Sequence, residues 1–134
     1  DAFATDVNDP YGGIEVIDPE TMTSKGIVVD DKDLGAYTQA IRLASETVGY
    51  VITGGLAIAS FDPMTYAVIN TAFYMTAGFY LPDFSIDESG NLYIAETAFG
   101  GEGIVVTDGS GTKLAGPVAV GAPPSSITFA GYEE

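Results

Sequence analysis

Short runs rich in Ile, Val, Tyr and Phe recur along the chain, and groups of turn-forming residues separate them. Residues 39–44 and 48–53 flank the turn Ser45-Glu46-Thr47, and a second pair of runs flanks the acidic turn at residues 87–91. Acidic and small residues between two apolar runs are typical of β-hairpins. Residues 33–46 have some helical spacing, but their alignment with residues 83–86 favours a strand. The pattern therefore predicts an all-β protein.

One phrase occurs three times: residues 13–19 read GIEVIDP, residues 57–63 read AIASFDP and residues 103–109 read GIVVTDG. The aspartates within it, Asp18, Asp62 and Asp108, follow one another at intervals of 44 and 46 residues. In a strand-rich sequence, a period of about 40 to 50 residues indicates a β-propeller or a related repeat array. We therefore expect a β-propeller-type repeat with about three four-stranded antiparallel blades.

The repeat divides the chain into units at about residues 1–35, 36–79 and 80–120, followed by a closing strand at 125–129, within a single repeat region spanning 1–134. The first unit begins with a second-type strand at residues 2–5, so it lacks a first strand, and the closing strand is a spare one. These staggered ends predict strand exchange between the termini or between subunits. The expected assembly strands are represented by Phe3, Ala4, Ile127 and Phe129.

The turn residues are expected to be structural. Asp18, Asp62 and Asp108 recur in every unit, which indicates a task that every unit needs, namely ending the third strand and starting a turn. The turn at residues 87–91 resembles a metal loop, but a hairpin explains it better, with Gly90 or Asn91 in the left-handed conformation.

Composition excludes several classes of function. The 134 residues include 19 Asp plus Glu against 4 Lys plus Arg, a net charge of −15. Such a chain is a poor ligand for nucleic acid or anionic lipid, because both require positive charge. The absence of Cys and His removes thiolate sites and imidazole-dependent triads. No apolar run is long enough to predict a membrane span.

Two groups of side chains are candidates for ligand binding. Asp30, Asp31 and Asp33, and separately Asp6, Asn8 and Asp9, could offer oxygen ligands to Ca²⁺. Neither group follows the EF-hand pattern, and exposed acidic loops explain them better, so no cofactor is expected. Aromatic pairs at residues 73–74 and 79–80 could line a binding rim, although packing between blades is the simpler role.

Residues 85–96, SIDESGNLYIAE, resemble the signature of NHL-type and gluconolactonase-like six-bladed propellers, and residues 103–108 resemble its continuation. The resemblance implies a propeller fold and an extracytoplasmic bacterial setting, whether secreted, cell-surface or periplasmic. It implies no particular activity. Gluconolactonase-like enzymes hold one divalent metal at the axis, and Glu46, Asp83 and Glu96 lie near the expected inner-strand ends.

The expected function is therefore non-enzymatic: a binding or assembly module that associates by β-strand completion into an oligomer or filament. Its expected partner is a second copy or a complementary propeller segment. The chain could equally be the C-terminal part of a larger propeller. The alternative from another class is a metal-dependent hydrolase or lactonase with a site at the propeller axis.

Overall fold

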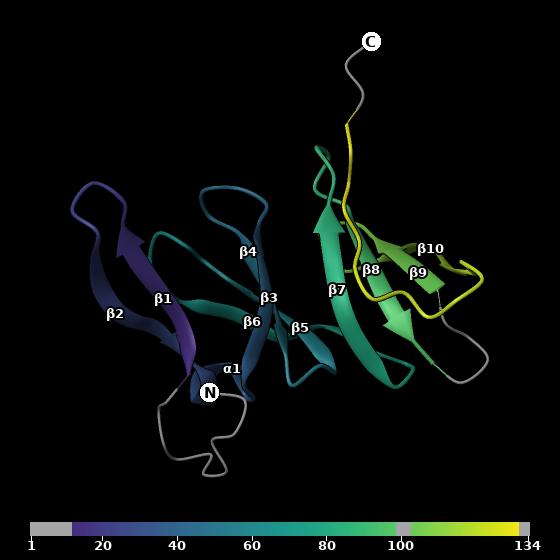
Figure 1. Cartoon of the computed structure of the whole chain (residues 1–134), viewed down its shortest axis with the longest axis horizontal. Helices are drawn as coiled ribbons and strands as arrows, with labels where there is room; N and C mark the ends of the chain where they lie inside the picture. The colour runs from purple at the N-terminus through teal and green to yellow at the C-terminus, as the bar shows by residue number, and fades with distance from the viewer. Residues whose placement is uncertain (1–11, 99–102, 132–134) are drawn as a thin grey trace.

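The structure is a computed structural model that describes residues 12–98 and 103–131. Within these residues, ten strands form three antiparallel sheets that follow one another across the molecule (Figure 1). The first sheet is the hairpin of β1 (Gly13–Asp18) and β2 (Thr23–Asp30). The second contains, in order, β3 (Thr38–Leu43), β4 (Gly49–Thr53), β5 (Ala57–Phe61) and β6 (Val68–Met75). The third contains, in order, β7 (Tyr80–Ile86), β8 (Leu92–Thr97), β9 (Gly103–Thr107) and β10 (Lys113–Val118).

The all-β prediction is confirmed, since both four-stranded sheets are antiparallel meanders whose neighbouring strands are consecutive in the chain. β3 is a strand, as the alignment with residues 83–86 predicted. The acidic loop expected at residues 30–33 instead contains the four-residue helix α1 (Asp31–Leu34). The Asp30 side chain caps it by accepting from the Lys32 amide, and Gly35 ends it in the left-handed conformation.

Two apolar layers join the three sheets. The layer between the second and third sheets contains fully buried side chains from both, listed here: Ile52, Ile58, Leu81, Phe84, Leu92 and Ile94. The layer beside the first sheet joins Val29 to Val51, Ala59 and Phe61 of the second sheet. Burial of this apolar surface is the main force that holds successive sheets face to face.

The predicted closing strand does not form within the single chain. Residues 125–129 run alongside β7, but they belong to none of the sheets. The amides of Ile127 and Phe129 donate to side chains and not to main-chain carbonyls, so no strand ladder forms. The other predicted assembly strand, with Phe3 and Ala4, lies outside the described residues.

The described residues contain no helix with the length and apolarity that crossing a membrane demands.

Candidate assembly site

The three repeated aspartates lie at equivalent turns between the third and fourth strands of their units. Each uses Oδ1 to accept main-chain amides of its own turn: Asp62 accepts from Met64 (2.7 Å) and Thr65 (3.1 Å), and Asp18 accepts from Glu20 (2.9 Å). Asp108 accepts from Ser110 (2.9 Å) and Thr112 (2.8 Å). These bonds favour the charged form, so amide donation by Thr65 and Met64 lowers the pKa of Asp62.

We expect Asp62→Asn to weaken the pH dependence of stability in acid. The folded-state pKa of Asp62 lies below that of an unfolded aspartate, about 3.9. Its contribution is therefore present above that pH and is lost as pH falls through the folded pKa. Urea unfolding of both proteins at pH 7 and pH 3 measures the effect. A difference between the two proteins that is the same at both pH values would contradict it.

The turn at residues 87–91 is closed by its own side chains. Asp87 Oδ1 accepts the amides of Ser89 and Asn91, both at 2.9 Å, and the Asn91 side-chain amide donates to Oδ2. Gly90 has φ of 81°, the left-handed conformation that the turn requires. The carboxylate oxygens of Asp87 are thus used within the hairpin.

The three candidate metal ligands do not come together. Glu46 is exposed in the hairpin turn between β3 and β4, Asp83 pairs with Arg42, and Glu96 is buried among donors from the connection between β6 and β7. Asp30 caps α1 and pairs with Lys32 at 3.5 Å. Within residues 12–98 and 103–131, no group of three or more acidic side chains is placed to hold a metal ion.

The first place that the repeat singles out is the inner edge of β1. The repeated phrase lies on β1, β5 and β9, and β5 and β9 are each the third strand of a four-stranded sheet. β1 therefore corresponds to a third strand and β2 to a fourth. Among the described residues, β1 has β2 as its only sheet neighbour, and residues 2–5, which the repeat assigns to the strand beside β1, lie outside the described residues.

The inner part of the second sheet is correspondingly uncovered on the side of β1. Ile41 and Leu43 on β3 are 39% and 63% exposed, whereas Phe84, the repeat equivalent of Ile41 on β7, is 0% exposed. A cavity of about 250 Å³ opens beside them, lined by apolar side chains from β1, β2 and β5 that include Ile14, Val28 and Phe61.

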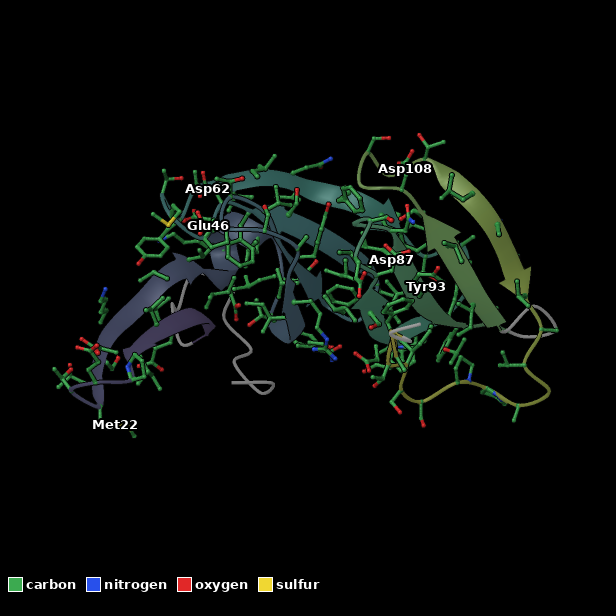
Figure 2. The ribbon with its side chains drawn as sticks, turned by 90° about the horizontal axis from the view of Figure 1, so that it is seen from above. Met22, Glu46, Asp62, Asp87, Tyr93 and Asp108 are labelled. Atoms are coloured by element: carbon green, nitrogen blue, oxygen red, sulfur yellow. The ribbon has the colours of Figure 1, made fainter. Side chains whose placement is uncertain are left out.

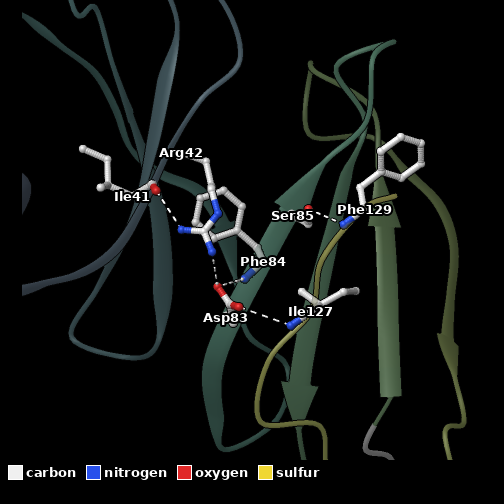
Figure 3. Close-up of polar contacts among 7 residues, drawn as sticks. All are labelled: Ile41, Arg42, Asp83, Phe84, Ser85, Ile127 and Phe129. Carbon is white, nitrogen blue, oxygen red and sulfur yellow. Dashed lines mark hydrogen bonds and ion pairs between the residues drawn. The ribbon is translucent and has the colours of Figure 1, made fainter. Parts of the chain in front are cut away.

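The second place is the face of the third sheet that points away from the second sheet. The segment of residues 125–131 lies on this face. The Ile127 amide donates to Asp83 Oδ2 (3.2 Å), and the Phe129 amide donates to Ser85 Oγ (2.9 Å), as Figure 3 shows. The Phe129 ring also contacts the ring of Tyr93 on β8, with centroids 5.9 Å apart.

Asp83 connects three parts of the molecule. Its Oδ1 accepts from the Phe84 amide (2.9 Å) and from Arg42 Nη2 on β3 (3.0 Å), while Oδ2 accepts from Ile127. The Arg42 guanidinium lies 5.7 Å from the centre of the Phe84 ring, and its Nη1 donates to the Ile41 carbonyl (Figure 3). Arg42 is thereby fixed, and the Asp83 carboxylate with it.

Sequence reasoning included Asp83, Ile127 and Phe129 but missed Arg42, Ser85 and Tyr93. Arg42 could have been noticed, because it is the single arginine of a strongly acidic chain and lies on a predicted first strand. No protein-family model and no curated protein matches this chain.

Proposed function

We propose that this protein is a non-enzymatic, extracytoplasmic assembly module of the β-propeller type, in which copies associate by completing a β-sheet. The observation that carries the proposal is the position of residues 125–129, which lie against β7 on the outward face of the third sheet and belong to no sheet among the described residues. The occupant is a second copy of the chain, which contributes residues 125–129. The extracytoplasmic setting rests on the resemblance of residues 85–96 to bacterial propellers.

The placement of residues 125–129 supports this choice of occupant. Inner strands of successive sheets are already linked once, by Arg42 on β3 and Asp83 on β7. Asp83 and Ser85 on β7 in turn bind the amides of Ile127 and Phe129. The segment is therefore linked to β7 as β7 is linked to β3. The triplet Ile127-Thr128-Phe129 also repeats the apolar–polar–apolar order of Ile41-Arg42-Leu43 and Phe84-Ser85-Ile86. This position and this pattern support the proposal that the segment acts as a first strand in the assembly.

The two places complement each other. One copy supplies a first strand without outer strands, and the next copy supplies β1 and β2, which are outer strands. The sequence repeat assigns residues 2–5 to the strand between them. Main-chain hydrogen bonds would provide affinity, while the alternation of Ile127 and Phe129 would fix the register.

We expect the full chain to associate in a concentration-dependent way in sedimentation equilibrium, and a chain lacking residues 125–134 to remain a monomer. Association should strengthen with added salt, because each copy carries a net charge of −15 and salt screens the repulsion. Circular dichroism of the shortened chain checks that its sheets still form.

A pair of full-length variants provides the matched control. Ile127→Asp/Phe129→Asp should abolish association, whereas Ser125→Asp/Ser126→Asp adds the same charge at exposed neighbouring side chains and should leave it. A full chain that remains monomeric at all concentrations and salt levels would overturn the proposal. Equal association by both variants would show that residues 125–129 are not the occupant.

A further inference from the structure

We infer that the outward face of the third sheet is a docking surface for the β1–β2 hairpin of a second copy, so that the interface between copies repeats the internal interface between the second and third sheets. This inference rests on the proposed function and specifies the two surfaces that would meet. The internal interface is the template, because repeated sheets present equivalent residues on equivalent faces.

The strand register defines these equivalent faces. In the second sheet, one row across the strands contains Arg42, Tyr50, Ser60 and Asn70, and a neighbouring row contains Ile52, Ile58 and Tyr74. In the third sheet, the equivalent rows contain Ser85, Tyr93, Val106 and Ala115, and Ala95, Ile104 and Val118. In the second sheet, Tyr50, Ile52 and Ile58 of these rows are covered by the third sheet.

The same rows on the third sheet are incompletely covered. Tyr50 and Ile58 are buried against the third sheet, whereas their equivalents Tyr93 and Ile104 are only half-buried. Val106 is half-buried as well, and Val118 at the outer end is exposed. Residues 125–131 lie over the β7 and β8 part of this face, and no other segment of the described residues lies over the part formed by β9 and β10.

The hairpin of β1 and β2 has the matching surface. Ile17 on β1 is 59% exposed, while Phe61 and Thr107, its equivalents on β5 and β9, are 2% and 0% exposed. Ile27 on β2 is the register partner of Glu15 on β1. Its side chain is exposed on the same side of the hairpin as Ile17. Ile17 therefore occupies a position that the other two units bury against the preceding sheet.

A turn contact completes the comparison. At the internal interface, the Tyr50 hydroxyl of the second sheet donates to the Gly109 carbonyl in the turn of the third sheet (3.4 Å). Tyr93 is the equivalent of Tyr50, and Pro19 in the β1–β2 turn is the equivalent of Gly109. The docked hairpin would bring Pro19 of one copy to Tyr93 of the other.

The occupant must come from another copy. Within one chain, the β1–β2 hairpin packs on the opposite side of the second sheet, and its tip near Met22 lies at the far end of the molecule from the third sheet (Figure 2). The second sheet separates the two surfaces (Figure 1). The contact is thus between two different surfaces, which generates a ring if it closes and a filament if it does not.

Two single substitutions test these surfaces. Ile17→Asp damages the hairpin surface and Val106→Asp damages the outward face, with the same change in charge. Each variant alone should be monomeric in sedimentation equilibrium, because every contact between identical copies uses one damaged surface. An equimolar mixture should form a one-to-one dimer and nothing larger, because one intact surface remains on each variant. Ile69→Asp, at an exposed site on β6, is the control and should associate like the wild type.

The outcomes separate the inference from the proposed function. Dimers that appear only in the mixture establish the two surfaces, and they also show that both variants are folded. Two results obtained while the wild type associates would show that the surfaces are wrong and that strand completion stands. In the first, each variant alone associates as well as the wild type. In the second, both variants melt cooperatively but their mixture remains monomeric. If the wild type does not associate, the proposed function itself fails.

Discussion

Replacing Glu96 with alanine is expected to lower the free energy of unfolding by about 2–3 kcal/mol, because several hydrogen bonds to one charged acceptor are lost together. Glu96 lies on β8 and is almost completely buried. Its carboxylate accepts from the amides of Ala77 (2.8 Å) and Gly78 (3.1 Å), from the Tyr74 hydroxyl (3.1 Å) and from the Thr76 hydroxyl. Alanine would remove the acceptor shared by the Ala77 amide and the Tyr74 and Thr76 hydroxyls, while the Gly78 amide would keep its bond to Thr76 Oγ1.

The carboxylate holds the connection between the second and third sheets. Residues 76–79 connect β6 to β7, and the Glu96 bonds add to two main-chain bonds that anchor this connection, from Thr76 to the Leu56 carbonyl (2.9 Å) and from Phe79 to the Thr97 carbonyl (2.7 Å). Burial, together with the nearby Glu96 charge, raises the pKa of Tyr74, so its hydroxyl keeps the donated proton throughout the physiological range. Glu96 thus keeps the two sheets in the relation that the docking surface copies.

Glu96→Gln and Tyr74→Phe are the graded controls. Glutamine keeps one acceptor oxygen and the side-chain volume, so its cost should fall well below that of alanine. Phenylalanine removes one donor and should cost about 1 kcal/mol. Urea unfolding at pH 7 followed by circular dichroism measures all three. An alanine variant as stable as the glutamine variant would show that the carboxylate does not organise this connection.

The strands and turns could be predicted from the sequence because their causes are local. β4 and β8 are short apolar runs bounded by turn residues, and the carboxylates of Asp62 and Asp108 bond amides within a few residues of themselves. Repetition of the phrase at residues 13–19 likewise assigns β1 to the third-type strands. Neither kind of inference needs a contact between distant segments.

The site itself could be predicted only in part, because its contacts join distant residues. Arg42 and Asp83 are 41 residues apart, and Phe129 and Ser85 are 44 apart. The sequence pattern of residues 125–129 predicted a strand, but a strand needs a neighbouring main chain. On the third sheet, the segment meets the side chains of Asp83 and Ser85 instead. The Pro123-Pro124 pair that precedes it has no amide donors to offer.

Phe84→Ala is expected to cost about 3–5 kcal/mol, as is usual for deleting a fully buried aromatic side chain. Phe84 is 0% exposed between the second and third sheets, beneath the Arg42 guanidinium. Its loss would open a cavity in the larger apolar layer and release Arg42 from the ring. Since this layer lies within one chain, the cost should be the same at every protein concentration. Thermal or urea unfolding at two concentrations measures it.

Ile41→Ala is the informative comparison, because Ile41 is the repeat equivalent of Phe84 on the uncovered side of the second sheet. In the isolated chain its side chain is 39% exposed, so truncation should cost only about 1 kcal/mol. In the assembly, the completed first unit would cover Ile41, and the cost should increase with protein concentration because association is linked to stability. A cost for Ile41→Ala that stays constant while the wild type associates would place the added strands elsewhere than over β3.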